Sequence, residues 1–339
     1  MSTRSTARAR RRAALLALGV IALVAAAALP ASAARGAGAA STAAPATGSL
    51  QPAILDVTGW PLVAPTSAPT PDAGDGIGPG SYLLISRTDG DFLCTANFLW
   101  SSGTTHYLGA AGHCFLPGGV PAAVGSDPYV KDVQVCVAGC AFGGQLGAIV
   151  TGDMRSLGQV VYARQLDAAG NDVGHDFGIV TVPSSLASLE RPSMPVWGGP
   201  SGSATIGTGT PVCVYGNGVV LGETFPTKGR TGVGTTESDG AWYAVLPSSP
   251  GDSGSAVENC APGGAGLAGT TAVGILTHLV IGDVGTTAGT TVARAQQMVA
   301  QDLGISLSLI NGDGTTAAAA PASGGTATHG RGHTKTGRR

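Results

Sequence analysis

Short apolar runs separated by turn residues dominate the middle of the chain. From Ser81 onward, β-branched and aromatic residues gather in short stretches between segments rich in Gly, Pro, Asn and Asp. This spacing favours an all-β sandwich or barrel. The strands predicted in this way are Tyr82–Ser86, Phe92–Trp100, His106–Ala111, Tyr129–Val137, Val160–Arg164, Phe177–Val182, Val212–Tyr215, Ala241–Leu246 and Thr271–Val280.

One segment near the end has helical periodicity instead. Its apolar residues recur three and four positions apart, at Val292, Ala295, Met298, Val299 and Leu303. Gly304 follows as a stop signal. We predict a C-terminal helix that packs its apolar stripe on the outside of the β body.

The two ends of the chain have different patterns. Residues 1–33 join an arginine-rich start to an apolar run and an A-x-A cleavage pattern, which predicts a cleaved signal peptide and a secreted protein. No later segment is apolar and long enough for a stable membrane span. Residues 34–78 are rich in Ala, Pro, Thr, Ser and Gly, which predicts a disordered linker or short pro-segment. We expect one folded domain over 79–310 and a disordered basic tail over 311–339.

Composition and charge narrow the function classes. Only 11% of the residues are charged, and 55 glycines and 21 prolines indicate many tight turns. Without residues 1–33 and the tail, the body carries a formal net charge of −10. Such a body repels polyphosphate, so we expect no nucleic-acid partner. Nothing in the pattern indicates oligomerisation, and we expect a monomer.

Six cysteines in an exported chain predict disulfides, but six cysteines allow fifteen pairings. Cys136 and Cys140 are the only close pair, and no second pair of cysteines or histidines lies near them. A zinc site normally needs four such ligands, so we expect no metal and no cofactor.

Three motifs carry candidate chemistry: Leu108-Gly109-Ala110-Ala111-Gly112-His113-Cys114, His175-Asp176-Phe177-Gly178 and Pro250-Gly251-Asp252-Ser253-Gly254-Ser255. A serine hydroxyl needs a base to remove its proton, and a buried carboxylate keeps an imidazole in the tautomer that does so. We expect Ser253 as nucleophile, His113 as base and Asp176 as its carboxylate. The glycines around Ser253 permit a tight turn, in which the N–H groups of Gly251 and Ser253 would form an oxyanion hole.

With these motifs in this order, residues 81–305 resemble the chymotrypsin-like (trypsin-fold) serine proteases, in particular secreted bacterial members. The resemblance implies two perpendicular six-stranded antiparallel β-barrels with the active site between them. Gly251-Asp252-Ser253-Gly254 is its most specific element, and Ala110-Ala111-Gly112-His113-Cys114 stands where the family has T-A-A-H-C. The resemblance also implies disulfides Cys94–Cys114 and Cys213–Cys260, which leaves Cys136 and Cys140 to pair locally.

The chain departs from the family pattern at a few positions. Gly112 replaces the usual alanine, and Ser255 replaces a glycine. No basic residue followed by I-V-G-G lies near residue 78, so the family's activation through a new amino terminus is not expected. Asp252 therefore needs a different partner.

The specificity pocket is also inferred from the resemblance. Thr277, His278 and Leu279 stand in the wall segment, where Thr277 would support the Asp176 carboxylate and Leu279 would narrow the mouth. The floor near Pro247 and Ser248 has no carboxylate, so Lys or Arg substrates are disfavoured. We expect a small or medium apolar residue before the cut, with an acidic residue bound by His278 as the alternative.

Two other functions remain open at this point. A catalytically silent relative could bind peptide or cell-wall material through the same cleft, and a surface-adhesion module could use the basic tail. An α/β-hydrolase is excluded because Ser255 breaks G-x-S-x-G and the helices between parallel strands are missing. We therefore predict a secreted serine endopeptidase that acts on proteins or peptides.

Overall fold

The computed structural model describes residues 54–56, 58, 75–143, 150–261, 270–280 and 285–317. The predicted signal peptide lies outside these residues, as do most of the predicted linker and tail. The described part consists mainly of strands, with few helices, which confirms the predicted all-β class. No helix within it is long and apolar enough to cross a membrane.

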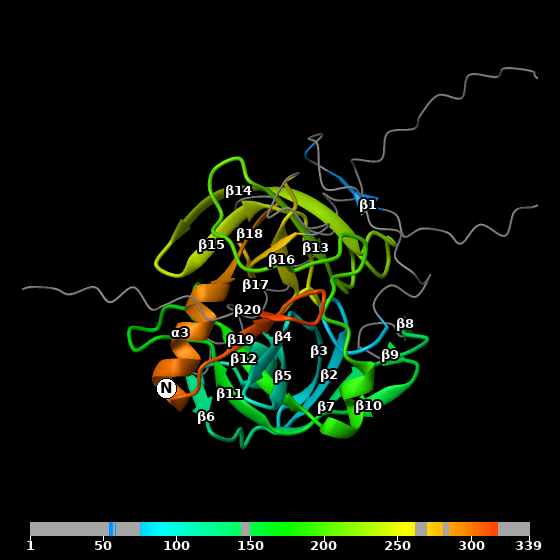
Figure 1. The fold of residues 1–339 in the computed structure, drawn as a ribbon, viewed down its shortest axis with the longest axis vertical. Helices are drawn as coiled ribbons and strands as arrows, with labels where there is room; N and C mark the ends of the chain where they lie inside the picture. The colour runs from blue at the N-terminus through cyan, green and yellow to red at the C-terminus, as the bar shows by residue number, and fades with distance from the viewer. Residues whose placement is uncertain are drawn as a thin grey trace, which may run out of the picture. The chain divides into compact units, whose positions relative to one another are not determined.

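The C-terminal half forms a closed antiparallel barrel, drawn in yellow and green in the upper part of Figure 1. Its strands pair in the order β14-β13-β16-β17-β18-β15, and β15 pairs back onto β14 to close the ring. Side chains such as Val212, Leu246 and Leu276 fill its interior. The six strands are β13 (Pro211–Tyr215), β14 (Gly229–Ser238), β15 (Ala241–Val245), β16 (Ala256–Asn259), β17 (Thr271–Leu279) and β18 (Thr286–Thr291).

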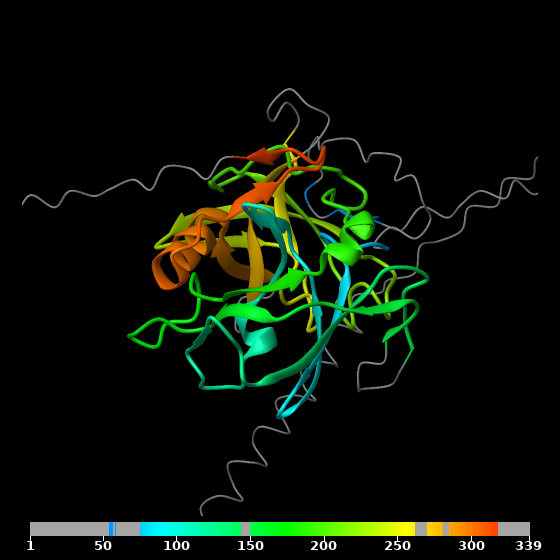
Figure 2. The ribbon, with the colours of Figure 1, turned by 60° about the horizontal axis from the view of Figure 1, so that its bottom comes forward.

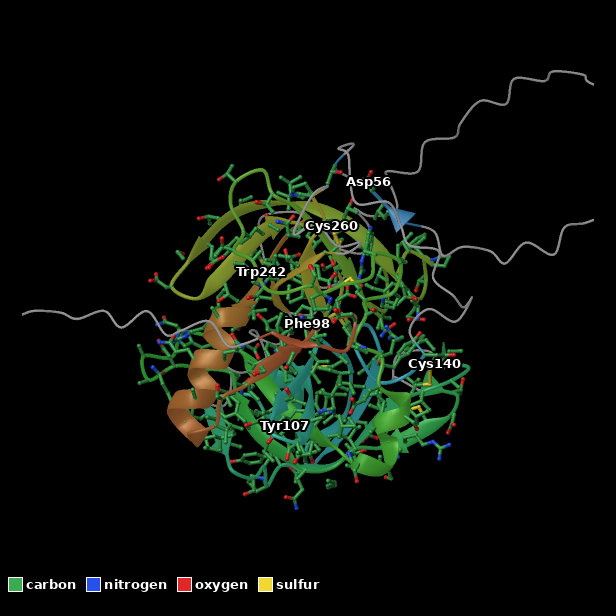
Figure 3. The ribbon with its side chains drawn as sticks, viewed as in Figure 1. Asp56, Phe98, Tyr107, Cys140, Trp242 and Cys260 are labelled. Atoms are coloured by element: carbon green, nitrogen blue, oxygen red, sulfur yellow. A yellow bond between two sulfur atoms is a disulfide. The ribbon has the colours of Figure 1, made fainter. Side chains whose placement is uncertain are left out.

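Glycines in two of these strands make room for the buried Trp242, which is labelled in Figure 3. A Cβ on Gly274 would lie 2.5 Å from the indole ring, and a Cβ on Gly289 would collide with the carbonyl oxygen of Ile275. The indole Nε1 donates a hydrogen bond to that same carbonyl, at 3.1 Å. The barrel therefore closes tightly around one large aromatic side chain.

The N-terminal half is built from two larger sheets, ordered β10-β7-β2-β3 and β20-β19-β4-β5-β12-β11-β6. Side chains from both sheets, including Leu83, Val135, Leu108 and Val180, share one apolar core. This half thus has the layered core of a barrel without one closed hydrogen-bonded ring among its described strands. Its strands are β2 (Tyr82–Arg87), β3 (Gly90–Thr95), β4 (Leu99–Ser102), β5 (Thr105–Ala110), β6 (Ala122–Val124), β7 (Val130–Cys136), β8 (Ala141–Phe142), β9 (Val150–Thr151), β10 (Met154–Ser156), β11 (Val160–Arg164), β12 (Phe177–Val182), β19 (Ser308–Ile310) and β20 (Thr316–Ala317).

A third apolar core joins the two halves. Phe98, Trp100 and Phe177 from the N-terminal half pack with Ala256 and Ile275 from the C-terminal half. The Trp100 and Phe177 rings meet edge to face with centroids 5.6 Å apart. This core fixes the two halves against each other, and Figure 2 shows their ribbons from a second direction. Side chains at the junction can therefore hold a defined geometry.

The predicted C-terminal helix is confirmed as α3 (Val292–Leu303). The Thr291 hydroxyl caps its first turn by accepting a hydrogen bond from the Arg294 N–H, and Gly304 ends it with a left-handed φ of 70°. Its buried residues Val292, Ala295, Met298 and Val299 belong to the core between the halves. Two short helical segments complete the described structure, α2 (Gly112–Phe115) and the 3-10 segment η2 (Ser184–Leu189).

The folded region extends past the predicted bounds 79–310 at both ends. Ile77 is fully buried, and its backbone N–H and C=O bond with residues 189 and 191. At the other end, β20 pairs with β19. Within the predicted linker, β1 (Ile54–Leu55) pairs in parallel with Gly229–Arg230 of β14, on a stretch that β15 leaves uncovered. Apolar residues at these ends are thus part of the fold.

A buried carboxyl group in β16 makes stability depend on pH. Glu258 is fully buried, and among the described residues only Thr270 hydrogen-bonds its carboxyl group, which leaves Oε1 without a hydrogen-bond partner. Burial raises the pKa of Glu258 from 4.5 to about 8. The folded state therefore keeps a proton that the unfolded state loses, so stability falls as pH rises from about 4.5 to about 8.

We expect Glu258→Gln to remove this dependence. Urea unfolding at pH 5 and pH 9 measures it, and the wild type should lose on the order of 4 kcal/mol more than the variant between these values. The amide keeps the size of the carboxyl group and cannot ionise. An identical pH dependence in the two proteins would show that Glu258 ionises normally in the folded state.

Candidate active site

His113 and Asp176 meet where β5 ends and the antiparallel β12 begins. His113 lies in α2, directly after β5, and Asp176 directly precedes β12, which pairs with β5. The His113 Nδ1 lies 2.6 Å from Asp176 Oδ2, and the His113 backbone N–H donates to Oδ1 at 2.9 Å. The carboxylate is 1% exposed and the imidazole 34%. A buried carboxylate thus orients a histidine whose other nitrogen is available for proton transfer.

The buried guanidinium of Arg87 holds α2, the short helix that carries His113. Arg87 Nη1 donates to the carbonyl oxygens of His113 and Leu116, both at 2.7 Å. Asp89 binds the same guanidinium through two hydrogen bonds of 2.9 Å, and the Phe92 ring stacks on it. Arg87 therefore satisfies carbonyl groups that a four-residue helix cannot pair internally.

The departure at Gly112 has a steric cause. A Cβ at this position would collide with the carbonyl oxygen of Arg164 and approach that of Phe177. Gly112 lets α2 lie directly on the ends of β11 and β12. The glycine next to His113 therefore preserves the placement of the histidine.

Three features of its environment act on the pKa of His113. Burial lowers the pKa of the imidazole, whereas the charge and hydrogen bond of Asp176 raise it, and Arg87 lowers it slightly. The net result is a pKa above the ordinary value of 6.5. A base of this strength can accept a proton near neutral pH.

Ser253 lies in a tight turn that packs on the strand leading to His113. Gly254 has a φ of 95°, and a Cβ there would lie 2.3 Å from the Thr95 carbonyl oxygen and 3.0 Å from the Ala111 nitrogen. Only glycine allows this approach. The Ser253 carbonyl accepts from the Thr95 N–H at 2.9 Å. Within the described residues, the Ser253 hydroxyl makes no hydrogen bond to His113.

The turn leaves two backbone donors free at the predicted positions. The N–H groups of Asp252, Gly254 and Ser255 donate to backbone carbonyls, whereas those of Gly251 and Ser253 have no acceptor among the described residues. Their directions are fixed because the N–H and C=O of a trans peptide point opposite ways. Pro250 C=O accepts from the Val219 N–H, and Asp252 C=O accepts from Ser255, so both free N–H groups point away from these contacts.

Asp252 has a partner that the sequence analysis did not identify. Arg230 on β14 binds it through two hydrogen bonds of 2.9 and 2.5 Å, with both side chains fully buried. The Ser249 N–H also donates to this carboxylate, at 2.7 Å. Arg230 was missed because it stands in a Gly- and Thr-rich segment that the pattern did not predict as a strand. The ion pair fixes the turn that carries Ser253.

Thr277 does not occupy the predicted role beside Asp176. Its hydroxyl shares a 2.7 Å hydrogen bond with His278 Nδ1, while Thr290 from β18 bonds both the N–H and the C=O of Asp176. A register shift between Leu276 and His278 displaces Thr277 in β17, which explains the difference. The carboxylate itself is held by His113.

The other predicted pocket residues lie at the end of β17 and beside β18: His278 and Leu279 end β17, and Ser248 is next to Thr287 of β18. His278 Nε2 is 3.2 Å from Asp172 Oδ2, and its ring lies edge to face with His113 at 6.4 Å. Leu279 is 41% exposed. Ser248 is half-buried and its hydroxyl lies 3.4 Å from that of Thr287. His278 is thus already paired with a carboxylate, which the sequence did not reveal.

The cysteines form the three expected pairs, Cys94–Cys114, Cys136–Cys140 and Cys213–Cys260. The first ties β3 to α2 and so to His113. His175, beside Asp176 in sequence, bonds Arg294 at 2.5 Å and takes no part in holding the Asp176 carboxylate. Across the described ranges, no group of three or more His, Cys, Asp or Glu residues is arranged to hold a metal ion.

No family model matches the chain, and no curated protein does. Solved structures with a similar fold are bacterial serine proteases. Thermobifida fusca Protease A has 18% identity over 68% of this chain and 97% of its own, with a TM-score of 0.42. Protease Anisep from Arthrobacter nicotinovorans has 13% identity over 65% of this chain and 92% of its own, with a TM-score of 0.44. Nocardiopsis protease has 19% identity over 69% of this chain and 98% of its own, with a TM-score of 0.36. Similarity at these scores assigns no activity to this chain.

The Arg230–Asp252 pair gives a prediction that needs no substrate. Arg230→Met leaves Asp252 buried without its partner, so we expect a loss of about 3–5 kcal/mol in unfolding free energy. Adding Asp252→Asn removes the unpaired charge and should restore most of that loss. Urea unfolding of the wild type, both single variants and the double variant measures the coupling. Additive effects would mean that the two residues do not form the pair described here.

Proposed function

We propose that the protein is a secreted serine endopeptidase that hydrolyses peptide bonds through an acyl-enzyme at Ser253. The observation that carries the proposal is the pair of N–H groups at Gly251 and Ser253 that have no acceptor among the described residues. Their turn packs against Thr95 and Ala111, and Ala111 lies two residues before His113. Two converging backbone donors are what the oxyanion of a tetrahedral intermediate requires. The disulfides and the predicted signal peptide support secretion.

In the proposed reaction, Ser253 Oγ attacks the carbonyl carbon while His113 Nε2 takes the hydroxyl proton. Asp176 keeps the other ring nitrogen protonated and stabilises the imidazolium. The N–H groups of Gly251 and Ser253 bind the oxyanion. His113 then gives its proton to the leaving amine as the C–N bond breaks, and water releases the acyl group by the reverse sequence of proton transfers.

The contacts of His278 favour an apolar residue before the cut. Asp172 already pairs with Nε2, and Thr277 engages Nδ1, so neither nitrogen is free to bind a substrate carboxylate. Ser248 and Thr287 offer hydroxyl groups and no charge near the expected floor. We therefore propose a small or medium apolar residue at this position, in place of the acidic alternative.

A second candidate function is a silent relative that binds peptide in the same cleft. The absence of a Ser253–His113 hydrogen bond within the described residues is the observation in its favour. In serine proteases without substrate this bond is often long and tightens only in the complex. A covalent label for the nucleophile separates the two functions.

The direct test is cleavage of a mixed peptide library by the purified secreted protein and by Ser253→Ala. Loss of the nucleophile should reduce the rate by at least about 10⁴-fold, because base and nucleophile act as a unit. Ser201→Ala is a matched control, since Ser201, like Ser253, directly precedes a glycine in a loop. Among the described residues it hydrogen-bonds only the backbone of Thr270. Cutting only after Lys or Arg would contradict the proposed pocket. No cleavage, and no fluorophosphonate label on the wild type, would favour the silent relative.

The pH dependence tests the role of His113. The base works only when neutral, and Asp176 holds its pKa above 6.5, so kcat/KM should rise with pH through a midpoint above that value. Asp176→Asn removes the charge that raises the pKa. Its residual activity should be far lower, and its midpoint should move to lower pH. A midpoint that is the same in both proteins would assign the titration to a different group.

A further inference from the structure

Thr95 is a fully buried polar residue at the end of β3, and the proposed reaction does not use it. It belongs to the N-terminal half, next to the disulfide-bonded Cys94. Its contacts nevertheless reach across to the turn around Ser253. Both its backbone and its side chain take part in them.

Three hydrogen bonds define the position of Thr95. Its N–H donates to the Ser253 carbonyl oxygen at 2.9 Å, and its hydroxyl donates to the Gly251 carbonyl oxygen at 2.9 Å. The hydroxyl oxygen also accepts from the Asn217 N–H at 3.0 Å. Because Asn217 can only donate there, the hydroxyl proton is left for Gly251. The direction of this bond is therefore fixed by the donors around it.

The two carbonyls that Thr95 holds belong to the two residues with free N–H groups. Gly251 has a φ of 103°, and as a glycine it has no side chain to hold this backbone conformation. With Gly251 C=O held by Thr95 and Pro250 C=O held by Val219, the peptide groups on both sides of Gly251 are anchored. Neither could rotate without breaking one of these hydrogen bonds.

We propose that Thr95 is a positioning residue for the oxyanion hole, which its hydroxyl holds ready by fixing the carbonyl of Gly251. The inference rests on the proposed peptidase function and names a residue that this function had not included. Asn217, which donates its backbone N–H to the Thr95 hydroxyl, is itself held by further hydrogen bonds. Asn217 donates from Nδ2 to Gly80 C=O and accepts from Lys228, so the acceptor side of the hydroxyl is itself anchored in the protein.

The test compares Thr95→Val with the wild type in fluorophosphonate labelling and in hydrolysis of a peptide p-nitroanilide with an apolar residue before the cut. Valine keeps the shape and the backbone N–H bond to Ser253 and loses the hydroxyl. We expect kcat and the labelling rate to fall about tenfold with KM nearly unchanged, because the oxyanion forms only in the transition state. A peptide boronate should lose affinity by a similar factor, whereas a product peptide should not.

Thr181→Val is the matched control, since the Thr181 hydroxyl in β12 hydrogen-bonds only Gln159 among the described residues, and no residue of the turn around Ser253. If Thr95→Val does not fold, Thr95→Ser and Thr95→Ala replace it, because these two differ only in the hydroxyl. The kcat of Thr95→Ser should then exceed the kcat of Thr95→Ala by about tenfold. Equal kcat values for the paired variants, with an active wild type, would overturn the inference and leave the peptidase proposal intact. A wild type that neither cleaves nor labels would overturn the peptidase proposal itself.

Discussion

The turn around Ser253 and the proposed catalytic histidine, His113, come from distant parts of the sequence, and a close backbone contact brings the two segments together. Gly254 allows the turn around Ser253 to lie on the Thr95 carbonyl and the Ala111 nitrogen, closer than any side chain would permit. The Thr95 N–H then bonds the Ser253 carbonyl. This contact spans the junction of the two halves. The apolar core that includes Phe98, Trp100 and Ile275 supplies the burial that keeps the halves from separating there.

Each half contains a buried aspartate, and the two have different roles. The Asp176 carboxylate has its hydrogen bonds from His113 and serves the proposed chemistry, whereas Asp252 is paired with Arg230 and fixes the turn. Burial raises the pKa of Asp252, and the charge and hydrogen bonds of Arg230 oppose that rise. Glu258 lacks such a partner among the described residues, and the consequence is a proton held to unusually high pH. The same barrel thus contains one buried acid that is paired with a buried cation and one that has no ionic partner among the described residues.

The elements rich in Val, Ile, Leu and aromatic residues could be predicted from the sequence, and α3 with its Gly304 stop could be predicted almost to the residue. β14 and β18 could not, because their glycines interrupt the strand pattern. In β18, Gly289 lies against Trp242, and in β14, Gly234 lies against Ile206, contacts that only the fold creates. The His113–Asp176 pair could be predicted from its motifs. Arg230, Thr95 and Thr290 could not, because each acts through a partner brought close only by the fold. Thr277 was misplaced because the register shift in β17 leaves no trace in the sequence.

We propose that Gly251 and Ser253 present their N–H groups to an oxyanion formed at Ser253, beside His113. A crystal structure of the secreted protein with a peptide boronic acid tests it most directly, because the tetrahedral boron adduct has the shape of the transition state. The account predicts a bond from Ser253 Oγ to boron, with one boronate oxygen within hydrogen-bond distance of both N–H groups. A boronate bound away from Ser253, or an adduct whose oxygens contact neither N–H group, would contradict it.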